Sequence, residues 1–330
     1  MKIKQSGIIG LGAYVPKKIV TNFDLEKIMD TSDEWIKTRT GIEERRFVEK
    51  GEATSDLAVE AAKRALKCAN VSIEEIDMII VATCTPDYQI PSTACVVQKK
   101  IGAINAAAMD LGAACSGFIY GLTVAKGLVG IGTYKKVMVI GAEVLSSILD
   151  MSDRNTAVLF GDGAAAAIVS EVEEGFGLLS THLGADGDLK ETLGIKSGGS
   201  LHGTTAATLE GKEHFLRMKG QEVFKFAVKA LPTATLEALK LANLKSEDID
   251  LIVPHQASRR IIEAASKKIE VPMEKFFLNL SKVGNTSAAS IGIALDEALE
   301  KKLIKKGDII AITGFGGGLT FGSIIMKWCY

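Results

Sequence analysis

The feature of this 330-residue sequence that most restricts its fold is an internal repeat spaced by about half the chain. The stretch Ser-Ile-Glu-Glu-Ile-Asp-Met-Ile-Ile-Val at 72–81 resembles Lys-Ser-Glu-Asp-Ile-Asp-Leu-Ile-Val at 245–253. Downstream, Lys-Lys-Val-Met-Val-Ile-Gly at 135–141 resembles Lys-Gly-Asp-Ile-Ile-Ala-Ile-Thr-Gly at 306–314. Residue 76 matches 249 and residue 141 matches 314, an offset of 173 in both cases. A half-chain period predicts two duplicated halves, which we place at residues 1–174 and 175–330.

Short, apolar, β-branched runs alternate with longer segments of helical periodicity along the whole chain. We expect strands at residues 76–82, 136–140, 164–169, 249–253 and 308–312. We expect helices at residues 56–69, 117–129, 222–241, 258–268 and 287–300. This alternation predicts an α/β layered fold.

Composition excludes several classes of partner. The net charge of −1 provides no general attraction to nucleic acid or to a membrane surface. No run reaches the roughly 18 apolar residues that a membrane span needs. The five cysteines form no CxxC pair and no zinc-type spacing with the four histidines. We therefore expect a cytoplasmic protein with reduced thiols, no metal, and neither nucleic acid nor membrane as a partner.

Three polar residues are candidates for chemistry. Cys115 lies between an expected strand and an expected helix, and a helix N-terminus favours the thiolate, so we predict a lowered thiol pKa. The repeat brings Asn285 to a similar central position, and His255 directly follows an expected strand end. Taken singly, each has a simpler interpretation. Cys115 is then a small core residue, His255 a satisfied polar residue and Asn285 a helix cap.

Seven short motifs strengthen the chemical interpretation. They are Asp-Thr-Ser-Asp-Glu-Trp-Ile at 30–36, Thr-Arg-Thr-Gly-Ile at 38–42, Ala-Ala-Cys-Ser-Gly at 113–117, Phe-Gly-Asp-Gly at 160–163, Pro-His-Gln-Ala at 254–257, Gly-Asn-Thr-Ser-Ala-Ala-Ser at 284–290 and Phe-Gly-Gly-Gly at 315–318. From end to end, the chain resembles the β-ketoacyl-acyl carrier protein synthase III family, which initiates type II fatty-acid synthesis. The resemblance implies the thiolase fold, with two pseudo-symmetric halves in a layered αβαβα arrangement.

The resemblance also implies a mechanism. Cys115 attacks an acyl-CoA thioester and holds the acyl group covalently. The backbone N–H groups of Cys115 and Gly317 then form the oxyanion hole. Malonyl-acyl carrier protein loses carbon dioxide, and His255 and Asn285 stabilise the resulting enolate, with Phe315 supporting decarboxylation. CoA enters as part of a substrate, so neither a cofactor nor a metal is implied.

Binding residues follow from the same resemblance. The implied CoA contacts are Thr31, Trp35, Arg39, Arg154, Met218, Gly220, Phe224 and Ser258. Ser258 stands where the family usually has Asn, which puts one direct hydrogen bond in doubt. On its own, the 31–34 stretch is a helix capping box and Trp35 a core residue. The implied carrier-protein docking residues are Lys225, Gln256, Arg259, Arg260, Lys267 and Lys268.

The resemblance further implies a homodimer in which Ile90 reaches the partner's primer pocket. Some relatives carry Phe at this position, so the smaller Ile90 predicts a pocket that admits four- to five-carbon acyl primers. Alternatively, Phe118 or Leu145 fills the freed space and acetyl remains preferred.

Other functions were weighed against this one. A type III polyketide or starter-unit condensing enzyme uses the same three residues and stays open. A thiolase needs a second cysteine near residues 314–318, where the chain offers only Cys329. A dinucleotide fingerprint at Gly10 and Gly12 lacks its third glycine, because Val15 stands there. A catalytically silent subunit lacks the nucleophile, which is present here.

Overall fold

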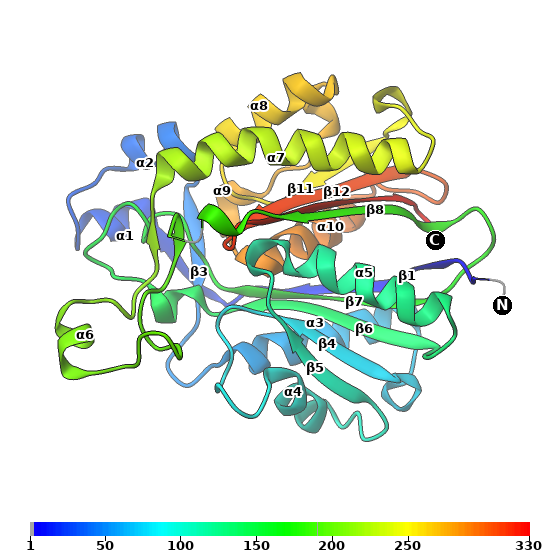
Figure 1. The fold of residues 1–330 in the computed structure, drawn as a ribbon, viewed down its shortest axis with the longest axis horizontal. Helices are drawn as coiled ribbons and strands as arrows, with labels where there is room; N and C mark the ends of the chain where they lie inside the picture. Colours follow the sequence, from blue (N-terminus) through cyan, green and yellow to red (C-terminus); the bar gives the residue numbers. More distant parts are fainter. Residues whose placement is uncertain (1–2, 190) are drawn as a thin grey trace.

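The computed structural model describes residues 3–189 and 191–330 of the chain. Helices and sheets alternate in five layers (Figure 1). The first sheet has the strand order β1-β7-β6-β4-β5, with β1 (Ser6–Tyr14), β4 (Met78–Ala82), β5 (Ala107–Leu111), β6 (Lys136–Glu143) and β7 (Gly163–Glu171). The second has the order β11-β12-β13-β8, with β8 (Gly177–Ala185), β11 (Leu251–Pro254), β12 (Ile309–Gly316) and β13 (Thr320–Lys327).

Helices form the other three layers. The outer layers are α3 (Thr54–Ala69) with α4 (Thr93–Ile101), and α7 (Gly220–Leu241) with α8 (Arg259–Ile269). The central layer is α5 (Gly117–Gly130) with α10 (Ser290–Glu300). Smaller elements are α1 (Asn22–Glu26), α2 (Asp33–Thr40), α6 (Ala206–Glu210), α9 (Leu280–Val283), β2 (Lys18–Thr21), β3 (Glu44–Phe47), β9 (Leu193–Gly194) and β10 (Arg217–Met218). The α/β layered class predicted from the alternation is confirmed.

Side-chain alternation along β4 explains why the layers stack. Ile80 packs into the central core, whereas Ile79 and Val81 pack into the outer core beneath α3. All three are fully buried, because successive strand residues point to opposite faces and both faces are covered. Burial on both faces therefore explains why β4 is a continuous apolar run and not an alternating one.

Four strands of the first sheet, β4-β6-β7-β1, have the same arrangement as the four strands of the second, β11-β12-β13-β8. In each, a parallel pair (β4–β6, β11–β12) is followed by two antiparallel pairs. The paired elements β4 and β11 start at residues 78 and 251, β6 and β12 at 136 and 309, and α5 and α10 at 117 and 290, which is 173 residues apart each time. The expected division after residue 174 falls between β7 and β8 and remains a prediction.

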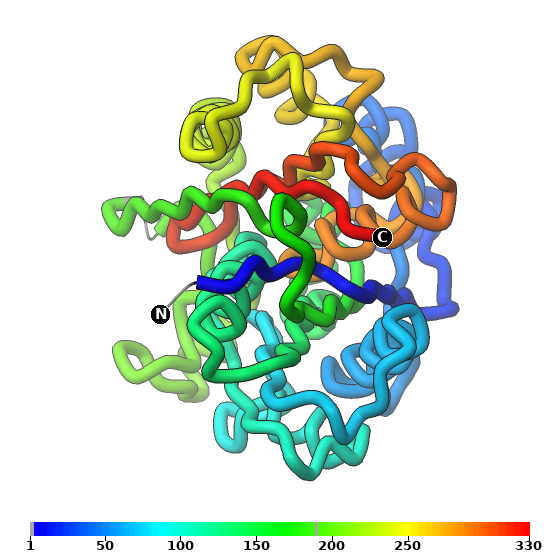
Figure 2. The backbone as a smooth tube through the Cα atoms, turned by 90° about the vertical axis from the view of Figure 1, so that its right-hand side faces the viewer, coloured from blue at the N-terminus to red at the C-terminus, as the bar shows by residue number. Residues whose placement is uncertain are grey.

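One segment of the first half lies against the second half. Figure 2 shows the N-terminal segment in blue crossing to the side of the orange C-terminal segments. There α2 contacts α8, and a Cβ added at Gly41, just after α2, would lie 3.1 Å from Cβ of Arg259. This crossing places Trp35 on α2 at the entrance of the cavity described below.

The expected elements lie inside the observed helices and strands to within a few residues, except that residues 287–289 form the 3₁₀ turn η7 (Ser287–Ala289) before α10. The expectations did not include α4, β8 or β13, and the strand expected before Cys115 is β5. Within residues 3–189 and 191–330, no helix is both long enough and apolar enough to cross a membrane.

Gly10 and Gly12 have a packing role in β1. A Cβ at Gly12 would lie 2.4 Å from the backbone N of Ala65, and one at Gly10 would lie 2.4 Å from Cβ of Ala69. Both contacts belong to α3, so these glycines allow the helix to lie directly on the strand.

We therefore expect Gly12→Ala to lower the free energy of unfolding by about 1–3 kcal/mol, because backbone of α3 must shift. Gly127→Ala is the matched control, since Gly127 lies on an exposed part of α5 with open space around it. That control should be neutral or stabilising. Urea unfolding of both variants checks the difference, and equal stabilities would contradict the close-packing role.

Candidate active site

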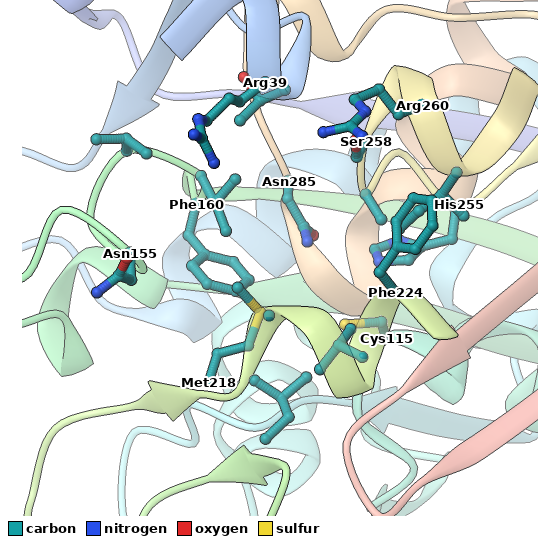
Figure 3. A pocket seen from close by; sticks show the side chains of 18 of the residues that line it. Arg39, Cys115, Asn155, Phe160, Met218, Phe224, His255, Ser258, Arg260 and Asn285 are labelled. Carbon is teal, nitrogen blue, oxygen red and sulfur yellow. The ribbon is translucent and has the colours of Figure 1, made fainter. Parts of the chain in front are cut away.

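Cys115, His255 and Asn285 all line one cavity of about 270 Å³. Cys115 belongs to the 3₁₀ turn η2 (Ala114–Ser116), His255 follows β11, and Asn285 follows α9. Figure 3 shows Asn285 and His255 pointing toward the same space above Cys115. Residues from both halves of the chain therefore meet at one site.

The turn that carries Cys115 is tightly packed. Ala114 has a positive φ of 46°, which costs a non-glycine residue conformational energy. A Cβ at Gly117 would lie 2.8 Å from Cβ of Ala82, and one at Gly316 would lie 2.5 Å from the backbone N of Cys115. The surrounding glycines thus allow β4 and β12 to hold the turn in this conformation.

The second half contains a matching turn. Ser287, at the start of η7, has φ of 47° and lies 173 residues after Ala114. At the same offset, the position equivalent to Cys115 is Ala288. Asn285 therefore lies three residues before Ala288, the residue that matches Cys115 in the repeat.

The prediction of a lowered Cys115 pKa is wrong for this structure. The thiol is buried at the start of α5, and burial raises its pKa to about 12. The Ser287 hydroxyl and a backbone hydrogen bond lower the pKa, but their effect is smaller than that of burial. Cys115 is therefore protonated at neutral pH and must lose a proton when it attacks.

His255 is held as a neutral imidazole. It is 1% exposed, and burial lowers its pKa to about 3. Its Nδ1 lies 2.6 Å from Oγ of Ser290, the first residue of α10. If the hydroxyl donates to Nδ1, the ring proton is on Nε2, which leaves a donor for the cavity. Phe315 packs against the imidazole edge-on, with ring centroids 5.5 Å apart.

Asn285 is oriented by its own loop. Its Oδ1 accepts a hydrogen bond from the backbone N–H of Ser287 at 2.9 Å, and its backbone N–H donates to the carbonyl of Leu159. Because the carbonyl oxygen of the amide is occupied, the Nδ2 group is the part free to donate. Two neutral donors, from His255 and Asn285, therefore line the cavity with Cys115.

The cavity opens at a cluster of arginines around Trp35. The guanidinium carbons of Arg39 and Arg154 lie 4.9 and 5.3 Å from the centre of the indole ring. Met218, Gly220, Phe224 and Ser258 line the passage between this entrance and Cys115. Thr31 does not line it, but its buried hydroxyl has no hydrogen-bond partner among the described residues.

Cys115 also lines a second, mostly apolar cavity of about 260 Å³. Gly317 lines it, together with Leu145, Ile148 and Leu216. Of the two side chains expected to compete for space near the primer, Leu145 lines this cavity, whereas Phe118 is fully buried in the central core. Cys115 therefore lines both the cavity that reaches Trp35 and the apolar cavity.

The basic residues predicted to dock a carrier protein lie along α7 and α8. Arg260 and Lys225 line a depression at the entrance, beside Arg39. Arg259 forms an ion pair with Glu263, whereas Lys267 and Lys268 are exposed in the last turn of α8.

Gln256 was wrongly included among the docking residues. Its side chain is fully buried. The amide donates to the carbonyls of Pro254 and Phe277 and accepts from the backbone N–H groups of Asn279 and Leu280. It therefore supports the loop after β11 from inside and cannot contact a partner.

The structure adds residues that the motifs did not single out. Ser290 and Ser287 belong to the recognised 284–290 motif, but their roles depend on contacts with His255 and Asn285. Asn155 lines the entrance, and Glu143 lies fully buried behind Cys115. The residues next to them in the sequence do not distinguish these four polar residues from polar residues without a role in the site.

A five-layer α/β fold that surrounds a buried cysteine, a neutral histidine and an asparagine defines a condensing acyltransferase of the thiolase fold. The family model described as 3-oxoacyl-[acyl-carrier-protein (ACP)] synthase III matches residues 109–187, and the model of its C-terminal part matches residues 239–328. The chain belongs to the β-ketoacyl-acyl carrier protein synthase III family, and the predicted resemblance is confirmed.

Named relatives cover almost the whole chain. The β-ketoacyl-[acyl-carrier-protein] synthase III of Fusobacterium nucleatum is 58% identical over 98% of this chain and 99% of its own length. That of Clostridioides difficile is 55% identical over 98% of both chains. The crystal structure of the Aquifex aeolicus 3-oxoacyl-[acyl-carrier-protein] synthase III has a TM-score of 0.90 at 48% identity, and the match covers 98% of this chain and 100% of that one.

We expect His255 to remain neutral from pH 5 to pH 8, because its pKa of about 3 lies below this range. In ¹⁵N-histidine spectra, the ring signals of His255 should show the neutral Nε2–H tautomer at every pH in this range. These signals are assigned to His255 because they are missing from the spectrum of His255→Ala. Ser290→Ala should introduce the other tautomer. A titration of His255 near pH 6.5, or an unchanged tautomer in Ser290→Ala, would contradict the arrangement. His182, His202 and His214 provide internal comparison.

Proposed function

We propose that this protein joins a short-chain acyl-CoA primer to malonyl-acyl carrier protein by decarboxylative Claisen condensation, giving a β-ketoacyl-acyl carrier protein. The observation that carries the proposal is the single cavity that connects Trp35 at the surface to Cys115, His255 and Asn285. A long, narrow substrate such as the pantetheine arm of CoA fits a passage of this kind. The acyl group then extends into the apolar cavity beyond the thiol.

In the first half-reaction, Cys115 attacks the thioester carbonyl and CoA leaves. The adenine lies at Trp35, whose ring is flanked by two guanidinium groups. The N–H groups of Cys115 and Gly317 stabilise the tetrahedral oxyanion. Close approach of β12 to the backbone N of Cys115 supports this pairing. Ser258 lines the passage with a hydroxyl in place of the family's usual amide.

In the second half-reaction, malonyl-carrier protein occupies the same passage. Decarboxylation places charge on the thioester oxygen, where His255 and Asn285 each donate a hydrogen bond. Neutral donors suit this task, since a buried imidazolium would have to be desolvated first. The ring of Phe315 beside His255 excludes water from the leaving carboxylate.

The acidic carrier protein docks on the exposed basic side chains around the entrance. Arg260 and Lys225 lie nearest to the passage, and Arg259, Lys267 and Lys268 extend the surface along α8. Surface charges of this kind mainly accelerate association and depend on salt. Binding therefore weakens as ionic strength rises.

We also propose that the protein is a cytoplasmic homodimer. Strand β5 lies at the edge of its sheet, where an unpaired strand is available for a second copy. Tyr88 and Ile90, in the loop before α4, are 59% and 90% exposed in the single chain. Large apolar side chains with such exposure favour an intersubunit contact.

A related starter-unit condensing enzyme is the second candidate. The priming β-ketosynthase of the R1128 polyketide pathway matches with a TM-score of 0.92 at 33% identity, covering 99% of this chain and 97% of that one. The two candidates share the same thiol chemistry and differ in the acyl group loaded and the carrier that accepts it. Mass analysis of products from a panel of acyl-CoAs with a fatty-acid carrier protein distinguishes them.

We expect Cys115→Ala to acquire no acyl group from acyl-CoA, whereas His255→Ala and Asn285→Ala still load one per subunit. The last two variants should lose about 10²–10³-fold in malonyl decarboxylation, since each lacks one donor to the enolate. Intact-mass and carbon dioxide assays separate the half-reactions. Acylation of Cys115→Ala would refute the nucleophile, and equal losses in both half-reactions would refute the division of labour.

We expect Ile90 to set primer length. Ile90→Phe should reduce kcat/KM for butyryl- and isobutyryl-CoA relative to acetyl-CoA, by roughly 10-fold or more, because a larger ring shortens the partner's pocket. Ile90→Leu, of equal volume, is the control. Analytical ultracentrifugation reports whether the dimer persists in each variant. Unchanged ratios in a dimeric Ile90→Phe, or full activity in a monomer, would contradict the shared pocket.

A further inference from the structure

Glu143 is a fully buried carboxyl at the end of β6, next to the catalytic turn. Its Oε2 accepts hydrogen bonds from the hydroxyls of Thr83 and Thr85, at 3.2 and 2.7 Å, and from the backbone N–H of Cys84 at 3.0 Å. Its Oε1 has no hydrogen bond of normal geometry among the described residues, although the atom is buried. Buried carboxyl oxygens without a partner are costly, which points to a function for this one.

Ser287 links this carboxyl to the thiol. Ser287 and Cys115 line the same cavity, and the backbone N–H of Ser287 is fixed by Oδ1 of Asn285. Its positive φ holds the residue in an unusual conformation at the start of η7. The turn η7, which begins with Ser287, contacts both η2, which carries Cys115, and β6, which ends at Glu143. In keeping with this position, the Ser287 hydroxyl lowers the pKa of Cys115 and the pKa of Glu143.

The acylation step requires a group that accepts a proton. Burial raises the pKa of the Cys115 thiol to about 12, so the thiol has to release a proton as it attacks. His255 is a weak base, because burial holds its pKa at about 3. Glu143 is the better acceptor, since burial raises the pKa of its carboxyl above the ordinary value of 4.5. A negatively charged Glu143 also opposes thiolate formation, and this opposition ends once the carboxyl is protonated.

We propose that Glu143 holds the proton that Cys115 releases on acylation, and that the Ser287 hydroxyl passes this proton between the thiol and the carboxyl. The inference rests on Cys115 being the nucleophile of the proposed function. Glu143 is a positioning residue in this scheme, because it acts on the thiol through Ser287.

The proton balance closes over the two half-reactions. As the bond from Sγ to the acyl carbon forms, the thiol proton moves to Oγ of Ser287 and the Ser287 proton moves to Glu143. The bond between the acyl carbon and the CoA sulfur breaks, and the CoA thiolate takes a proton from solvent. After condensation, the bond from Sγ to the acyl carbon breaks with its electron pair on Sγ. The proton stored on Glu143 then returns through Ser287 and restores the thiol.

Among residues 3–189 and 191–330, the titratable side chains that face Glu143 are two thiols. Cys84 faces it from the loop after β4, and Cys115 faces it from η2. The other groups in contact are the hydroxyls of Thr83, Thr85 and Ser287, which do not titrate in the working pH range. Burial raises the pKa of both thiols, so neither neighbour titrates below pH 8.

The test uses the full-length protein and single-turnover acylation of Cys115 by acetyl- or butyryl-CoA, quenched and read by peptide mass between pH 4.5 and pH 8. In the wild type, the rate should rise as the pH passes upward through the raised pKa of Glu143, because only the carboxylate accepts a proton. Glu143→Gln keeps the shape of the side chain and should lower the rate at least about 100-fold, and Ser287→Ala at least about tenfold. In both variants the rise with pH should disappear.

Asp162→Asn is the matched control. Asp162 is another buried carboxyl with a raised pKa, but it accepts hydrogen bonds from Ser146 and from the backbone N–H of Val48. This variant should lose stability yet keep the rise of acylation with pH. Glu143→Asp, which retains a carboxyl, should recover part of the rate and the rise with pH. Thermal unfolding of every variant separates folding defects from loss of the relay.

Each outcome decides the proposal. Acylation of Glu143→Gln or Ser287→Ala at the wild-type rate and pH dependence overturns it. A uniform loss with the rise in pH retained assigns Glu143 a structural role only, and also overturns it. A wild-type protein with no acyl group on Cys115 instead refutes the nucleophile of the proposed function. Slow, pH-independent acylation in both variants supports the relay.

Discussion

The close approach of two helix starts at the centre of the molecule determines the rest of the site. The turns before α5 and α10 each contain a non-glycine residue with positive φ, Ala114 and Ser287. A Cβ at Gly141 would lie 2.3 Å from the carbonyl oxygen of Ala288, so β6 and η7 are in direct contact. Such contact is possible because the central helices are enclosed by sheets on both sides. The strain of the turns is offset by a large central core.

Burial at this centre controls the charge state of every reactive group. Enclosure raises the pKa of Cys115 and lowers that of His255, so both are neutral before substrate binds. Desolvation of a charged thiolate or imidazolium would be costly in this environment. A neutral site suits a reaction in which negative charge develops only in the transition state, since fixed donors then act on it without reorganisation. The reactivity of Cys115 therefore depends on which group accepts the thiol proton. The dipole of α5 alone does not lower the pKa of the thiol enough to release it.

The sequence could predict the layered fold because its signals are local and repeated. An apolar run such as residues 76–82 is defined by neighbouring residues, and the repeat at an offset of 173 residues shows the same local pattern twice. The site was harder to predict because its energetics depend on distant segments. Burial reversed the expected pKa shift of Cys115, and hydrogen bonds to four backbone groups placed Gln256 inside the protein. Glu143 belongs to no motif, because its hydrogen-bond partners are distant in the sequence: Thr83, Cys84 and Thr85 lie 58 to 60 residues before it.

The half-chain repeat explains why a site of this kind lies between the halves. We propose that residues 1–174 and 175–330 derive from one ancestral unit, whose helix starts met across a two-fold axis. Identical halves would place the same residue type at Cys115 and at position 288, yet the second is alanine. The two turns therefore carry one nucleophile, Cys115, and the second turn has a different role. Ser287 and Asn285 lie at this second turn, where the backbone N–H of Ser287 donates to Oδ1 of Asn285, whereas the first turn carries the thiol. The chemistry thus requires both halves, because neither turn alone provides a nucleophile and the groups that stabilise its products.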